Sequence, residues 1–186
     1  SCLSNKRGPI YYYGGLFELL SGGVNRMMGY DYNDHAYHNV RHLFNALFGF
    51  LCIYFIALLM GRFAGWKTAL VTLILLFLTP RFLWHSMMNP KDIPFAAGYM
   101  MSIYFTMRLL SEMPKPSWKV VAGLIVGIGM SIGIRIGGIL LIAYLGLFAA
   151  VDFIARYGLS AIWKQVPLVL RYAAYVLGIA LGGFII

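Results

Sequence analysis

The chain has 186 residues, of which 61% are hydrophobic and 11% are charged, and its formal net charge is +9 at pH 7. Soluble domains usually contain about 25% charged residues, so this composition excludes a soluble domain and indicates an integral membrane protein. The basic excess does not require a nucleic acid. Most basic residues lie at the ends of apolar runs, where they suit anionic lipid headgroups or a phosphate-bearing substrate. We expect the lipid bilayer, and no nucleic acid, as a partner.

Residues 1–42 are predicted to form a segment outside the bilayer. Apolar residues recur at helical spacing over residues 16–28, but this run is too short and too polar to span a membrane. It favours an amphipathic helix on the membrane surface, or a helix that merely packs on a bundle. Residues 43–186 are then a multi-span transmembrane domain. Because the chain lacks an initiator Met and ends inside an apolar run, we expect a fragment that is cut at both ends.

Three histidines follow the first helix at positions i, i+3 and i+7, namely His35, His38 and His42. On a helix they would share a face with Asp31, and imidazole and carboxylate are suitable ligands for a divalent metal. The same face could be only polar and interfacial, because no tight metal motif is present. A divalent metal is therefore a candidate cofactor, and none is required. Arg41 could bind a phosphate or simply anchor the next span.

Six apolar runs predict an all-α bundle with about six membrane spans. They lie near residues 43–60, 68–84, 94–110, 120–134, 136–153 and from 168 onward. From residue 43 on, the connections after the first, third and fifth spans carry eight Lys or Arg residues, and the opposite short connections carry three. Cytoplasmic connections are rich in these residues, so the opposite connections, with Lys91 and Arg135, are predicted to face outward.

Residues 85–97 concentrate polar side chains between the second and third predicted spans. Pro90 and Pro94 bracket Lys91 and Asp92 and restrict the backbone there. In the simpler interpretation, Asp92 caps a helix that starts near Pro94, and Lys91 reaches lipid headgroups. In the functional interpretation, this carboxylate and this ammonium are held at the membrane surface to handle a charged substrate.

Arg135 interrupts a long apolar stretch and has glycines at positions 133, 137 and 138. An unpaired guanidinium inside a bilayer is costly, so Arg135 needs a partner. It could break a re-entrant turn at the outer interface and meet lipid phosphate, or pair with a carboxylate such as Asp92. Ordinary snorkelling to the headgroups is the remaining alternative.

Several sequence blocks together carry a resemblance to a known family. The most specific is Asn-Pro-Lys-Asp-Ile-Pro-Phe-Ala-Ala at residues 89–97, and the others are residues 12–18, 41–49, 80–86 and 134–138. In this order they resemble bacterial membrane glycosyltransferases of the C-type superfamily. These are similar to the dolichyl-phosphate-mannose protein mannosyltransferases and the lipid A aminoarabinose transferases.

The resemblance implies an enzyme of the bacterial inner membrane whose active site faces the periplasm or exterior. Such an enzyme moves a sugar from a polyprenyl-phosphate carrier to a protein, lipid or glycan acceptor. The match implies that Asp92 is an acidic residue near the active site and that Arg135 lies near the carrier phosphate. It also implies that the main catalytic acid lies upstream of Ser1. Chemically, Lys91, Arg135 and Arg41 could stabilise the phosphate leaving group, while Asp92 assists the base or positions a cation.

Two other classes of membrane protein fit parts of the pattern. A transporter could line a solute path with Lys91, Asp92 and Arg135, because buried charges and glycine-broken spans suit that function. A haem protein could use the histidines, but none of them lies in the middle of a span, so this class ranks last. The histidines concerned are His35, His38, His42 and His85.

Overall fold

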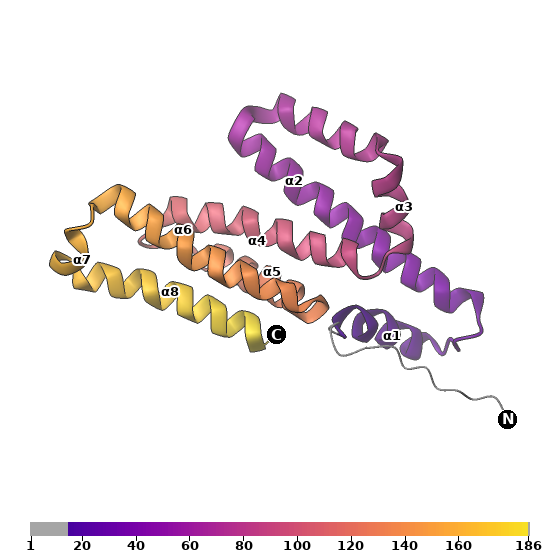
Figure 1. The fold of residues 1–186 in the computed structure, drawn as a ribbon. Coiled ribbons are helices and arrows are strands. Elements are labelled where there is room, and N and C mark those ends of the chain that lie inside the picture. Colours follow the sequence, from indigo (N-terminus) through magenta and orange to yellow (C-terminus); the bar gives the residue numbers. More distant parts are fainter. Residues whose placement is uncertain (1–14, 186) are drawn as a thin grey trace.

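The computed structural model describes residues 15–185, which fold almost entirely into helices (Figure 1). The elements are α1 (Leu16–Met28), α2 (His35–Leu78), α3 (Pro80–Met88), α4 (Asp92–Glu112), α5 (Trp118–Ile134), the 3-10 turn η2 (Ile136–Gly138), α6 (Ile139–Tyr157), α7 (Ala161–Lys164) and α8 (Val166–Ile185). Within the described residues, three helices are long and apolar enough to cross a membrane, namely His35–Leu78, Ile136–Tyr157 and Val166–Ile185. The predicted all-α membrane class is confirmed.

α2 contains the first two predicted spans and a sharp bend between them. At Gly65 the backbone has φ 84° and ψ 171°, a region that is essentially restricted to glycine. The chain reverses direction there, and the second half of α2 runs back towards α3 (Figure 1). The predicted connection at residues 61–67 is therefore almost entirely helical, because one residue makes the reversal. α2 also begins earlier than the predicted span, at His35, so the helix runs through residue 42.

α1 forms where helical spacing predicts it, and it packs against α2 and α5. The side that it buries carries Phe17, Ser21 and Asn25. Its large apolar side chains point away from the bundle and are exposed: Leu19, Leu20, Met27 and Met28. α1 therefore combines the two alternatives, because it packs on the bundle through a small and partly polar face and presents an apolar face outward. The earlier part of the predicted outer segment, residues 1–14, lies outside the described residues.

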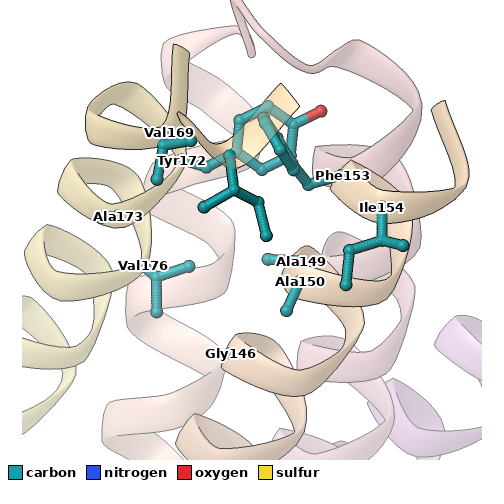
Figure 2. Close-up of a pocket in the computed structure, with 10 residues that line it drawn as sticks. Gly146, Ala149, Ala150, Phe153, Ile154, Val169, Tyr172, Ala173 and Val176 are labelled. Carbon is teal, nitrogen blue, oxygen red and sulfur yellow. The ribbon is translucent and has the colours of Figure 1, made fainter. Parts of the chain in front are cut away.

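The remaining predicted spans correspond to α4, α5, α6 with η2, and α8, with ends that differ by a few residues. α7 is a single turn, Ala161–Lys164. Between α6 and α8 lies an apolar cavity of about 280 Å³, whose walls include Gly146, Ala149 and Ala173 (Figure 2). No charged side chain lines it, so we do not place the functional site there.

α4 and α5 pack antiparallel through small residues spaced four apart, Gly98 and Ser102 on α4 and Gly127 and Ser131 on α5. A Cβ on Gly98 would lie 2.7 Å from Ser131 Oγ, and one on Gly127 would lie 2.7 Å from Ser102 Oγ. Each serine hydroxyl donates to the carbonyl of the glycine on its own helix, at 2.8 and 2.9 Å. Such residues let helix backbones approach closely in a membrane, where packing rather than the hydrophobic effect holds helices together.

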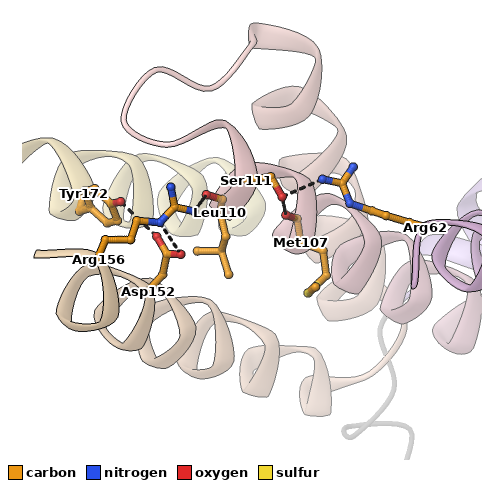
Figure 3. Close-up of polar contacts among 7 residues, drawn as sticks. All are labelled: Arg62, Met107, Leu110, Ser111, Asp152, Arg156 and Tyr172. Carbon is orange, nitrogen blue, oxygen red and sulfur yellow. Dashed lines mark hydrogen bonds and ion pairs between the residues drawn. The ribbon is translucent and has the colours of Figure 1, made fainter. Parts of the chain in front are cut away.

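The connections gather at two ends of the bundle. At one end, Arg62 Nη2 donates to Ser111 Oγ at 2.7 Å, and Arg156 Nη2 donates to the Leu110 carbonyl at 2.7 Å (Figure 3). These contacts join the ends of the first, third and fifth predicted spans, as the alternation of spans requires. The direction of the bundle relative to the cytoplasm stays a prediction.

We predict that Gly127→Leu destabilises the protein, because the added side chain would overlap Ser102 and push α4 from α5. Overpacking of this kind costs about 1–3 kcal/mol, or several degrees of melting temperature in a chain of this size. The measurement is thermal stability in detergent, followed by size-exclusion chromatography. Gly178→Leu on α8 is the matched control, because a Cβ there meets nothing within 4 Å. Equal melting temperatures for the two variants would contradict the role of the α4–α5 contact.

Candidate functional site

Asn89 organises the turn between α3 and α4. Its Oδ1 accepts hydrogen bonds from the backbone N–H of Lys91 at 3.2 Å and of Asp92 at 3.0 Å. Its Nδ2 donates to Asp92 Oδ2 at 2.7 Å. Amides at the start of a helix need such an acceptor, and Asn89 supplies it for α4. The prediction that Asp92 caps a helix starting near Pro94 is therefore wrong, because α4 already begins at Asp92.

The Asp92 carboxylate instead pairs with Arg135, as the second interpretation of Arg135 predicted. Asp92 Oδ1 and Arg135 Nη2 form an ion pair across the α4–α5 contact. The guanidinium also lies over the Phe95 ring, 6.0 Å from its centroid, where a cation interacts favourably with the aromatic face. The side chains of Arg135 and Asp92 are 36% and 51% exposed, so the pair is accessible to a ligand.

The backbone around Arg135 is fixed by a sharp turn between α5 and η2. Arg135 is extended, with φ −145° and ψ 139°, and separates α5 from η2. η2 then folds back on the end of α5, so that a Cβ on Gly138 would lie 2.5 Å from the backbone nitrogen of Ile132. Only glycine fits this position. The break that the sequence suggests at Arg135 is therefore a structural feature, and it presents the guanidinium to the start of α4.

A second ion pair, which the sequence analysis did not identify, ties α1 to α2. Arg41 donates to both carboxylate oxygens of Glu18, at 2.5 and 2.7 Å. Its guanidinium also lies 5.4 Å from the centroid of the Phe17 ring. The hydrogen bond from Arg41 lowers the pKa of the Glu18 carboxyl, partly offset by burial and reinforced by the positive charges of Arg41 and Lys91. Arg41, a predicted phosphate ligand, is thus already engaged by a carboxylate.

The three histidines of the predicted metal site are in different environments. His35 is exposed at the start of α2, and the His38 ring packs against Tyr32 and Tyr37. His42 Nδ1 lies 2.9 Å from a backbone carbonyl oxygen in α3. Within residues 15–185, no group of three or more His, Cys, Asp or Glu side chains could hold a metal ion. Metal binding stays a prediction without an assembled set of ligands in this part of the chain.

A cavity of about 460 Å³ opens beside Asp92, between the end of α2, α3 and α4. Its walls are largely apolar, and its charged or titratable groups are Arg81, His85 and Asp92. The lining residues are Leu76, Thr79, Arg81, Phe82, His85, Asp92, Ile93 and Ala96. We call this cavity the Asp92 groove. A largely apolar wall with a few polar and charged groups suits an amphiphilic ligand.

Comparison with known protein families decides the class. A family model described as dolichyl-phosphate-mannose-protein mannosyltransferase matches residues 38–181, which is most of the chain. The chain belongs to this family. The match confirms the resemblance that the sequence blocks carry, and it indicates a membrane glycosyltransferase rather than a transporter or a haem protein. No curated protein and no solved structure matches the chain. Helix α1, with Glu18, precedes the matched region.

We predict that Glu18→Gln weakens the protein at neutral pH and makes no difference in acid. The folded-state pKa of Glu18 lies below its ordinary value of 4.5, so its contribution is present above that value and is lost as the pH falls through the lowered pKa. Because the pair is partly exposed, we expect at most about 1 kcal/mol. Melting temperatures of wild type and variant in detergent at neutral and acidic pH measure this. A difference that persists unchanged in acid would contradict the assignment.

Proposed function

We propose that this glycosyltransferase takes its sugar from a polyprenyl-phosphate carrier and binds the carrier phosphate between Lys91 and Arg135. The observation that supports this most directly is the Asp92–Arg135 ion pair, which lies beside an apolar groove and at the first turn of α4. An apolar groove suits a polyprenyl chain, and the two cations beside Asp92 suit its phosphate. The sugar is then held where the groove opens.

Departure of a phosphate develops negative charge, and cations aimed at that position stabilise it. A guanidinium has five N–H donors in a planar fork that matches phosphate oxygens, and Lys91 adds a compact ammonium. Both residues lie near the N-terminus of a 21-residue helix, whose dipole also favours an anion. This combination of two cations and a helix N-terminus supports the choice of Lys91 and Arg135.

We assign Asp92 a positioning role in this reaction. The Asp92 carboxylate accepts one hydrogen bond from Asn89 Nδ2 and pairs with Arg135, so it holds the guanidinium beside the groove. The acceptor hydroxyl or amine must lose a proton to a base. By the family resemblance we expect that base upstream of Ser1. The acceptor is a protein, lipid or glycan on the non-cytoplasmic face, in line with the distribution of Lys and Arg among the connections.

We expect Asp92→Asn and Arg135→Gln each to reduce sugar transfer at least tenfold, because Arg135→Gln removes a cation that stabilises the leaving phosphate and Asp92→Asn removes the carboxylate that positions this cation. Full-length protein in detergent would be incubated with a panel of radiolabelled polyprenyl-phosphate sugars, and the released carrier counted. Lys91→Ala should raise the KM for the donor.

The matched control is Arg62→Gln, which removes a guanidinium at the opposite end of the bundle. It should leave donor turnover near the wild-type value. Turnover that survives in the Asp92 and Arg135 variants would place the phosphate elsewhere. Absence of turnover with every donor in the panel would contradict the proposed donor class.

A further inference from the structure

The ring of His85 faces the NH₂ end of the Asn89 side chain, which can only donate hydrogen bonds. His85 Nδ1 lies 3.1 Å from Asn89 Nδ2. An amide NH₂ group has two donors and no acceptor, so a favourable contact requires an unprotonated Nδ1. The state of this imidazole therefore depends on which way the Asn89 amide points.

The orientation of the Asn89 amide is fixed by its other partners. Oδ1 accepts from two backbone N–H groups, those of Lys91 and Asp92, and Nδ2 donates to the Asp92 carboxylate. Rotating the amide by half a turn would set NH₂ against both backbone donors and the carbonyl oxygen against the carboxylate. All three contacts would become repulsive. Amide orientations are assigned from such networks, and this one allows a single choice.

With Nδ1 as an acceptor, the ring carries its proton on Nε2. The neighbouring His42 provides an internal contrast, because its Nδ1 lies 2.9 Å from the Met87 carbonyl oxygen, which can only accept. His42 therefore carries a proton on Nδ1. His85 and His42 therefore carry their protons on different nitrogens, because His85 Nδ1 faces the Asn89 amide and His42 Nδ1 faces the Met87 carbonyl.

His85 is also fixed through its backbone. Asn45, which is 1% exposed on α2, donates from Nδ2 to the His85 carbonyl at 3.0 Å. The next residue, Ser86, is buried against α2, so close to Gly49 that a Cβ there would lie 2.7 Å from Ser86 Oγ. The ring is therefore held on a backbone that is fixed to α2. His85 lines the Asp92 groove, and its Nδ1 is occupied by Asn89, so Nε2–H is the ring group with which it can bind a ligand there.

We propose that the Nε2–H group of His85 donates a hydrogen bond to a phosphate oxygen of the ligand in the Asp92 groove, and that Asn89 is the positioning residue that sets this donor. Arg81 and Thr79 line the same groove and add a positive charge and a hydroxyl. A neutral imidazole held with Nε2–H, beside a guanidinium, selects an anionic oxygen over an amine. This inference rests on the proposed function, because it deepens the account of the same site. It concerns hydrogen bonding and requires no proton transfer.

The state of the ring can be measured without any ligand. In full-length protein labelled with ¹⁵N-histidine and studied by NMR in detergent, we expect His85 to carry its proton on Nε2 and none on Nδ1. His85→Gln identifies the signal. Asn89→Asp keeps an oxygen for the helix cap and replaces the donating amide with a carboxylate, so it should protonate Nδ1. Protonated Nδ1 in the wild type would overturn the proposal.

The ligand is tested with farnesyl phosphate as the probe and farnesol as the control that lacks the phosphate. We expect the His85 Nε2 resonance to shift with farnesyl phosphate and to stay in place with farnesol. No shift at a saturating concentration would overturn the proposal. Inorganic phosphate in place of farnesyl phosphate distinguishes recognition of the phosphate alone from recognition of the lipid phosphate.

Turnover of the lipid-phosphate sugar gives a third readout. His85→Gln places an amide N–H near the position of Nε2 and should retain most of the kcat, whereas His85→Leu should lose about tenfold or more. Equal loss in both variants would contradict hydrogen-bond donation as the role of His85. If the wild type turns over no polyprenyl-phosphate sugar, the proposed function fails. The NMR state of the ring and its response to farnesyl phosphate then still decide the proposal for His85.

Discussion

The close antiparallel contact between α4 and α5 sets the positions of Asp92 and Arg135 at the candidate site. The register of the two helices is fixed by glycines and serines whose neighbours leave no room for a larger side chain. Asp92 lies six residues before Gly98, and Arg135 lies four residues after Ser131. At 1.5 Å per helical residue, these separations are about 9 and about 6 Å, so both side chains reach the same end of the contact. A shift of one helix along the other by a single turn would part them.

From this contact a chain of polar interactions crosses the bundle. It runs from Asn45 on α2 to the His85 carbonyl, through the His85 ring to Asn89, and on to Asp92 and Arg135. Each member of this chain constrains the orientation of the next, because adjacent hydrogen bonds share groups and polarise one another. The chain thus couples the orientation of the His85 imidazole to the placement of the Arg135 guanidinium between α5 and η2.

The sequence predicts part of this site because some of the constraints on it hold whatever the rest of the fold is. A lone Arg in an apolar stretch needs a partner wherever it lies, so the pairing of Arg135 with Asp92 could be predicted as one of few choices. The Arg41–Glu18 pair could not be predicted in the same way, because Arg41 lies at the end of an apolar run, where lipid headgroups satisfy a guanidinium equally well. The cap was misassigned for a related reason. Asn89 and Asp92 are both residue types that cap helices well. In the structure Asn89 accepts hydrogen bonds at the start of α4, and Asp92 pairs with Arg135 instead.

The two ion pairs differ in a way that bears on phosphate binding. Arg41 meets Glu18 through both terminal nitrogens, a two-pronged geometry that a phosphate could only replace by matching both contacts. Arg135 pairs with Asp92 and, like Arg41, also lies over an aromatic ring. Asp92 in turn has an alternative partner in Asn89, so its carboxylate stays hydrogen-bonded if the guanidinium turns towards a ligand. The cost of exchanging a carboxylate for a phosphate is therefore smaller at Arg135, which makes that end of the groove the better place for the anion.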